Sequence, residues 1–283
     1  LSPVAHGRIT ALHLDRIRAL PGVVDVFAAD GLPGDRLYGP ILKDEPILAG
    51  SVGGELLWLG QPVFAVIATT RDAARRAAAR AKDAIEFDPL PALLTPAAAH
   101  SAGAYVVPPM HLARSTTARA DAPPAEREAA VRAALETAPL RLSGTWTVGG
   151  QEQFYLEGQI SVAYPQEDGA LRIVCSTQHP TEMQHLVSHA LGLKAHKVQV
   201  QCRRMGGGFG GKESQSAVFA LVAAIAAQRL QRPVKLRVDR DDDFLITGRR
   251  HCFDYAFEVG HDDDGRILAA VVSMVSRAGA SAD

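Results

Sequence analysis

Residues 203–213 read R-R-M-G-G-G-F-G-G-K-E, and the rest of the sequence is best interpreted outward from this stretch. Five glycines lie between Gly206 and Gly211. Glycine has no Cβ, so it lets the backbone adopt positive φ and approach a ligand closely. Phe209 interrupts the glycines with a large ring, and Glu213 places a carboxylate directly after them. The composition predicts a loop that contacts a bulky ligand.

The sequence on either side predicts where this glycine-rich loop lies. Before it, residues 197–203 alternate in polarity, as in a half-buried strand whose buried face holds Val198, Val200 and Cys202. After it, residues 214–230 are apolar nearly all round, which predicts an interior helix. Glu213 is therefore expected at the amino terminus of that helix, where the helix dipole favours an ionised carboxylate and desolvation opposes it.

Two generic phosphate-loop patterns, G-x-G-x-x-G and G-x-x-x-x-G-K, also fit the stretch, because a glycine-dense run satisfies many patterns. A magnesium-nucleotide loop needs Ser or Thr after the lysine, but here Glu213 follows Lys212. The dinucleotide fingerprint needs an acidic residue about 20 positions further on. The region around Gln231 and Arg232 provides none, so neither nucleotide interpretation is favoured.

Helix and strand patterns are mixed along the chain of 283 residues, which predicts an α+β (mixed α/β) fold. Helices are expected over residues 12–20, 71–83, 125–137, 181–191 and 214–230. Strands are expected over residues 23–27, 62–69, 84–87, 140–148, 158–164, 171–176, 197–203, 234–238, 252–259 and 267–275. Prolines, alanines and small polar residues replace the periodic pattern between residues 94 and 124. We therefore expect domains at residues 1–100 and 131–283, joined by a linker at residues 101–130.

Charge and cysteine content exclude several classes of protein. The net charge of −1 gives no electrostatic reason to expect nucleic acid or an anionic membrane as a partner. The longest apolar stretch, residues 217–227, is too short to span a bilayer, so we expect a soluble, cytoplasmic protein. Cys175, Cys202 and Cys252 are widely separated, which favours reduced, mostly buried thiols. An iron–sulfur cluster needs about four cysteine ligands, so electrons from any redox reaction must leave through another domain or subunit.

Three blocks of sequence resemble the molybdenum hydroxylase family, and in particular the cofactor subunit of its xanthine dehydrogenase branch. They are G-G-Q-E-Q-F-Y-L-E-G-Q at residues 149–159, C-S-T-Q-H-P at residues 175–180, and the glycine-rich stretch. A fourth, D-R-D-D-D-F-L-I-T-G-R-R-H at residues 239–251, is similar to the family's continuation. The resemblance implies an α/β hammerhead-like domain at residues 1–100 and the first part of a molybdopterin-binding α+β domain at residues 131–283. Gln153 departs from the family, which has His there.

The resemblance implies hydroxylation of purines, such as hypoxanthine or xanthine, at a molybdenum–pterin centre. Electrons are expected to pass to 2Fe–2S clusters and FAD on partner domains or subunits, then to NAD⁺ or oxygen, within a hetero-oligomer. The family's catalytic-base glutamate is expected beyond Asp283, so we expect an excerpt of a longer protein that is inactive alone. The alternatives are an inactive cofactor-binding or assembly fragment, or a molybdenum hydroxylase for aldehydes or other N-heterocycles.

The same resemblance assigns roles to five residues. Gln178 ends a predicted strand, where ligand-facing groups are common, although it could also cap a turn. The resemblance implies that the NH₂ group of Gln178 approaches the oxo ligand of molybdenum. It places the backbone of Gly208, Phe209 and Gly210 against the cofactor, so that Gln178 and Phe209 reach the metal through its ligands. Glu213 resembles the glutamate that hydrogen-bonds the purine. The alternative is that Phe209 fills the core, as a lone Phe usually does, but the glycines on both sides of it disfavour that interpretation.

Other clusters predict no site. His185 and His189 share a helix face but lack a third metal ligand, so a solvated face is favoured over zinc. Residues 241–243 and 262–264 are acidic but lack the spacing of a calcium loop, and both are expected to be turns. Glu152 and Glu157 could form a glycosidase-like carboxylate pair, but their separation in sequence says little about their distance in space.

Overall fold

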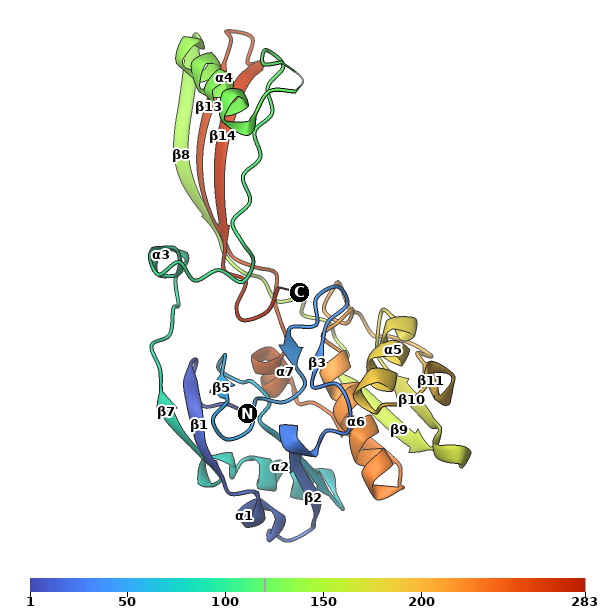
Figure 1. Cartoon of the computed structure of the whole chain (residues 1–283). Coiled ribbons are helices and arrows are strands. Elements are labelled where there is room, and N and C mark those ends of the chain that lie inside the picture. Colours follow the sequence, from blue (N-terminus) through green and yellow to red (C-terminus); the bar gives the residue numbers. More distant parts are fainter. Residues whose placement is uncertain (120, 283) are drawn as a thin grey trace. The chain divides into compact units, whose positions relative to one another are not determined.

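The computed structural model describes residues 1–119 and 121–282, and contacts between residues divide the chain into two compact units (Figure 1). The first unit contains Leu1–Ala92, Glu152–Arg249 and the described residues from Gly279 onward. The second contains Leu93–Gln151 and Arg250–Ala278, apart from residue 120. Each unit is therefore assembled from segments that are distant in sequence.

The amino-terminal part of the first unit is built from short antiparallel strands. One sheet has the order β5-β1-β7, and two further strand pairs are β2-β6 and β3-β4. The strands are β1 (Gly7–Leu12), β2 (Val23–Ala28), β3 (Leu37–Tyr38), β4 (Glu45–Pro46), β5 (Glu55–Leu56), β6 (Phe64–Ala68) and β7 (Ile85–Pro89). The helices are α1 (Leu14–Arg18) and α2 (Arg71–Ala78). The side chain of Thr70 caps α2 by accepting a hydrogen bond from the N–H of Ala73.

The remainder of the first unit is a four-stranded sheet of order β11-β10-β9-β12 with two longer helices. The elements are β9 (Ile160–Pro165), β10 (Leu171–Cys175), α5 (Pro180–Ala190), β11 (Val198–Gln201), α6 (Ala217–Leu230) and β12 (Val234–Arg237). The two strands expected at residues 158–164 and 171–176 are β9 and β10, which pair as an antiparallel hairpin whose turn places Asp168 at φ 55°. Every residue of α6 from Ala217 to Ala227 is buried, which explains why this segment is apolar on all sides. The main hydrophobic core therefore surrounds α6.

The second unit is a three-stranded antiparallel sheet of order β14-β13-β8. The elements are α3 (Pro96–Ser101), α4 (Pro124–Thr137), β8 (Leu140–Val148), β13 (Phe253–His261) and β14 (Ile267–Ser276). α4 packs on the sheet, and a Cβ at Gly260 would lie only 2.6 Å from the Cβ of Ala138. Glycine at position 260 therefore permits the close approach of the chain at the end of this helix.

Three expectations about secondary structure are wrong. The acidic run at residues 241–243 is not a turn but the start of α7 (Arg240–Ile246), where the helix dipole favours acidic side chains. The helix expected from residue 12 begins later, because residues 7–12 form β1, which pairs with β7 far away in sequence. α6 begins at Ala217 rather than at residue 214.

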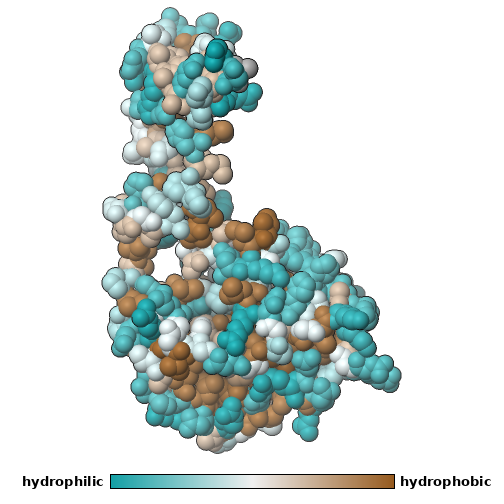
Figure 2. Space-filling view, in the orientation of Figure 1, coloured by the Kyte–Doolittle hydropathy of each residue, from teal (hydrophilic) through white to brown (hydrophobic). Residues whose placement is uncertain are grey.

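The surface drawn in Figure 2 is mostly hydrophilic, with hydrophobic side chains in scattered patches between. No helix in the described part of the chain has the length and apolarity that crossing a bilayer requires.

Candidate functional site

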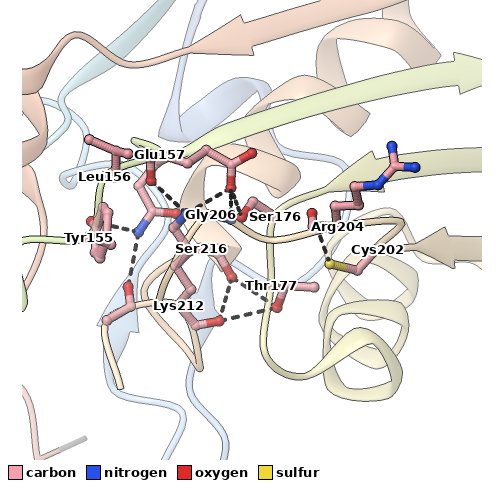
Figure 3. Close-up of polar contacts among 12 residues, drawn as sticks. Tyr155, Leu156, Glu157, Ser176, Thr177, Cys202, Arg204, Gly206, Lys212 and Ser216 are labelled. Atoms are coloured by element: carbon pink, nitrogen blue, oxygen red, sulfur yellow. Dashed lines mark hydrogen bonds and ion pairs between the residues drawn. The ribbon is translucent and has the colours of Figure 1, made fainter. Parts of the chain in front are cut away.

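Three of the sequence blocks quoted above meet in the first unit, although they are far apart in the chain (Figure 3). The first precedes β9 and contains Tyr155 and Glu157. The second leaves the end of β10 and contains Ser176 and Gln178. The third is the glycine-rich loop between β11 and α6. Because β10 and β11 are parallel neighbours, the segments that follow them leave the sheet at the same edge.

Gln178 lies at the strand end where the sequence placed it, and its side-chain amide is held by the loop. Its Oε1 accepts hydrogen bonds from the backbone N–H of Gly210 at 3.0 Å and of Lys212 at 3.2 Å. Its backbone N–H donates to the carbonyl of Lys212 at 2.8 Å. The carbonyl end of the amide is therefore occupied, and its NH₂ end is the one that can donate to a further group.

The loop has a conformation that needs glycine at several positions. Gly207 and Gly210 adopt φ values of 99° and 87°, and Phe209 adopts 54°. A Cβ at Gly208 would lie 2.5 Å from Oε1 of Gln178, so only glycine lets that amide approach. Phe209 is 75% exposed, which excludes the interpretation that its ring fills the core.

Glu213 is exposed beside Gln178, whose Nε2 donates to Glu213 Oε1 at 3.4 Å. The prediction that Glu213 occupies the amino terminus of the helix is wrong, because α6 begins four positions later, at Ala217. Glu213 thus belongs to the loop, and the dipole argument does not apply to it. The structure brings Gln178, Gly208, Phe209, Gly210 and Glu213 into one small region.

Lys212 points into the protein rather than toward a ligand. Its side chain is fully buried, and its ammonium donates to the carbonyl of Glu157 at 2.7 Å, to Glu157 Oε2 at 3.1 Å and to Ser176 Oγ at 2.9 Å. An ammonium has three N–H donors, so all of them are used. This lysine cannot bind a phosphate, which agrees with the rejection of a nucleotide loop.

The carboxylate of Glu157, which pairs with Lys212, accepts hydrogen bonds from other groups as well. Its Oε2 also accepts from Ser176 Oγ at 2.6 Å and from the backbone N–H of Gly206 at 3.0 Å. Burial acts to raise the pKa of Glu157, but the hydrogen bonds and the charge of Lys212 outweigh it and hold the pKa below its ordinary value. Glu157 is therefore a structural anion, and its partner is Lys212 rather than Glu152.

A second buried network supports the same region and was not identified from the sequence. Tyr155 Oη donates to Asp243 Oδ1 at 2.6 Å, and Gln159 Nε2 donates to Tyr155 Oη and to the carbonyl of Gly211, each at 3.0 Å. Burial and the Asp243 carboxylate raise the pKa of Tyr155 well above its ordinary value, so the phenol stays protonated. No sequence signal joins Tyr155 to Asp243, because they lie 88 residues apart.

The remaining candidates lie outside this region or have ordinary surroundings. His185 and His189 are both exposed on α5, as expected for a solvated face. Cys175 is buried, and burial raises the pKa of its thiol to about 12. Cys202 and Cys252 are half-buried, and all three cysteines are free.

Comparison with known proteins explains this arrangement. A family model described as a molybdopterin cofactor-binding domain matches residues 118–283. A second, described as the a/b hammerhead domain of aldehyde oxidase and xanthine dehydrogenase, matches residues 1–91. Xanthine dehydrogenases from Oryza sativa subsp. japonica and Drosophila pseudoobscura pseudoobscura are 36% and 38% identical to the chain, over 290 and 285 residues. Each alignment covers 100% of this chain and 20% of the relative, so the chain spans about a fifth of these relatives.

A solved structure shares the fold. The aldehyde oxidoreductase from Desulfovibrio gigas aligns with a TM-score of 0.77 and 20% identity, over 97% of this chain and 30% of that one. The family models thus define the class of protein, a chain with a molybdopterin cofactor-binding domain. More particularly, the chain belongs to the molybdenum hydroxylase family of aldehyde oxidase and xanthine dehydrogenase. The predicted family, the α+β fold class and the molybdenum–molybdopterin cofactor of this family are confirmed.

The residues present fit such a cofactor. Gly210 is exposed and has open space where a Cβ would lie, and Phe209 beside it is exposed as well, whereas Gly208 is buried against Gln178. The Gln178 amide presents N–H donors, and an oxo ligand is an acceptor. Apart from Gly210 and its two chain neighbours, no atom lies within 4 Å of the position that a Cβ at Gly210 would occupy, so a ligand can approach the backbone there.

Proposed function

We propose that this chain provides the glycine-rich loop and the substrate-recognising glutamate of a purine-hydroxylating molybdenum enzyme. The observation that carries the proposal is the contact between Gln178 and Glu213, at 3.4 Å, beside an accessible loop backbone. In this proposal Gln178 faces the cofactor and Glu213 faces the substrate. The two side chains must lie close together, because the substrate reacts at the cofactor. When bound, the molybdenum–molybdopterin group supplies the redox chemistry of hydroxylation.

Each site residue then has a distinct task. The NH₂ group of Gln178 donates toward an oxygen ligand of the metal, and the backbone at Gly208, Phe209 and Gly210 borders the cofactor. Gln178 and Phe209 thereby contact the metal only through its ligands. The carboxylate of Glu213 accepts a hydrogen bond from the heterocycle and polarises it as charge develops on its ring nitrogens.

The rest of the reaction requires other parts of the protein. The chain has only three cysteines, too few to hold a 2Fe–2S cluster with four cysteine ligands. The clusters, together with FAD, would be carried by partner domains or subunits in a hetero-oligomer, with NAD⁺ or oxygen as the final acceptor. The catalytic base would also be supplied from outside residues 1–283. We propose that the protein is located in the cytoplasm. We also propose that residues 1–100 form a hammerhead-like domain, followed by a linker at residues 101–130 and a cofactor domain at residues 131–283.

Aldehydes are the alternative substrate class, because an aldehyde oxidoreductase shares the fold. That similarity, at 20% identity, concerns the fold alone. The curated relatives that support purines are more similar, at 36% and 38% identity, and both are xanthine dehydrogenases. Glu213 favours the same conclusion, since a carboxylate is a hydrogen-bond acceptor and a purine ring offers N–H donors whereas a simple aldehyde offers none.

The test uses the complete, molybdenum-loaded enzyme with a dye as electron acceptor. We expect hypoxanthine and xanthine to reduce the dye and simple aldehydes to be poor substrates. Reduction by aldehydes but by no purine would contradict the purine assignment. In a parallel assay, residues 1–283 expressed alone are expected to retain no cofactor and show no turnover. Stable retention of molybdenum by that segment would show that it forms a complete binding site.

A further inference from the structure

Lys212 is bonded to all three sequence blocks that form the candidate site. Its ammonium reaches the first block at the carbonyl and carboxylate of Glu157, and the second at Ser176 Oγ, as Figure 3 shows. It also lies 4.6 Å from the centre of the Tyr155 ring, a distance suited to a cation–π interaction. Lys212 itself belongs to the third block, the glycine-rich loop.

The backbone of Lys212 makes a second set of contacts with the same neighbours. Its N–H donates to Gln178 Oε1 at 3.2 Å. Its carbonyl accepts from the backbone N–H of Gln178 at 2.8 Å and from the hydroxyls of Thr177 and Ser216, each at 3.2 Å. The backbone and the side chain of Lys212 therefore both bind the second block, at Thr177 and Gln178 and at Ser176.

We propose that Lys212 is the positioning residue of this site, which holds Gln178 and Glu213 at their present separation without touching cofactor or substrate. Gln178 is bound directly to the backbone of Lys212, and Glu213 is the next residue in the chain. The identities of the cofactor and substrate rest on the proposed function, but the anchoring of the loop by Lys212 does not.

The chemistry of the side chain explains why lysine is required there. A buried ammonium is tolerated only when its charge and all of its donors are paired, and here Glu157 provides the opposite charge. Arginine would bring a planar group with five donors into a fully buried space that has acceptors for three, so it is not an equivalent replacement. Loss of the ammonium would remove its contacts with the first and second blocks at once and leave the loop held only by its remaining hydrogen bonds.

Hydrogen exchange measured by mass spectrometry on the full-length protein tests this role, without cofactor or substrate. In Lys212→Met, we expect the loop amides at residues 206–212 to exchange roughly tenfold faster or more, the ratio that loss of hydrogen bonds to a charged group gives. The amides of α6 should keep their wild-type protection. Lys194→Met is the matched control, because Lys194 is exposed and lies outside the site; it should change neither segment.

Unchanged loop exchange in Lys212→Met would overturn the proposal. So would a loss of protection that is equal in the loop and in α6, because that pattern indicates general destabilisation rather than loss of positioning. Lys212→Arg should not restore the protection of the loop, whereas full wild-type protection in Lys212→Arg would show that any cation suffices and would also overturn the proposal.

A milder variant covers the case in which Lys212→Met does not fold. Ser176→Ala removes one acceptor of the ammonium and one donor to Glu157 Oε2, and it leaves the charge pair of Lys212 and Glu157 in place. We expect it to accelerate loop exchange roughly threefold or more, with α6 unaffected. Unchanged exchange in this variant would contradict the proposal. None of these readouts involves turnover, so an enzyme that proved inactive on purines would refute the proposed function and leave this result unaffected.

Discussion

Gln178 and Lys212 bind each other through two hydrogen bonds that run in opposite directions. The backbone N–H of Gln178 donates to the Lys212 carbonyl at 2.8 Å, and the backbone N–H of Lys212 donates to Gln178 Oε1 at 3.2 Å. The oxygen and nitrogen of a glutamine amide are distinguished by their partners. Two backbone donors at Oε1, from Gly210 and Lys212, therefore orient the amide with its NH₂ group beside Glu213.

The first prediction concerns the contribution of the Gln178 amide to stability. Gln178→Met keeps the length of the side chain but leaves the N–H groups of Gly210 and Lys212 without their acceptor. The free energy of unfolding should fall by about 1–3 kcal/mol, toward the lower end because Gly210 is exposed. Urea titration measures this change. Gln199→Met, on the exposed face of β11, is the control, and an equal effect of both variants would show that the amide contacts contribute nothing.

The second prediction concerns the glycine that faces this amide. In Gly208→Ala the new methyl group would meet Oε1 of Gln178 at 2.5 Å, so the amide must give up its present contacts. We expect a loss of about 1–3 kcal/mol of stability and a lower molybdenum content in the complete enzyme. Gly149→Ala is the control, because its Cβ would enter open space. Full stability and full metal content in Gly208→Ala would contradict the packing described for the loop.

The third prediction is a pH dependence that arises from Glu157. Burial raises the pKa of Glu157. The hydrogen bonds from Ser176, Gly206 and Lys212 and the charge of Lys212 lower it by more than burial raises it, so the folded-state pKa lies below 4.5. A depressed pKa stabilises the fold above the unfolded-state value, and this stabilisation is lost as the pH falls below 4.5 toward the folded-state pKa.

Urea unfolding of the wild type and of Glu157→Gln at a series of pH values between about 6 and 3 measures this effect. The stability difference between the two proteins should shrink as the pH falls through that window, because the wild-type carboxylate becomes protonated. A difference that stays constant over the whole range would show that ionisation of Glu157 does not stabilise the fold.

Much of the fold near the site could be predicted because it depends on local patterns. The apolar run of α6 and the alternation of β9 and β10 are visible in the sequence, and the structure has both. α7 could not be predicted in the same way. Its acidic residues resemble a turn, and the helix is fixed by a distant contact, the hydrogen bond from Tyr155 to Asp243.

The sequence could predict which residues form the site but not how their side chains contact one another. The family resemblance selected Gln178 and Glu213, which the structure places at hydrogen-bond distance. The direction of Lys212 could not be predicted, since a lysine beside five glycines is equally suited to a phosphate or to the interior. Only the tertiary structure brings Glu157 and Ser176 to its ammonium, from 55 and 36 residues away in sequence.

The most direct test of the central claim is a comparison of Glu213→Gln with the wild type in the complete enzyme, by molybdenum content and purine turnover. Loss of one preorganised polar contact to the developing charge should lower kcat/KM for xanthine by roughly 10²–10³-fold and leave the molybdenum content unchanged. Glu167→Gln, in the exposed turn between β9 and β10, should behave as the wild type. Equal losses of metal and activity, or unchanged purine turnover in Glu213→Gln, would contradict the role of Glu213 as the group that recognises the purine.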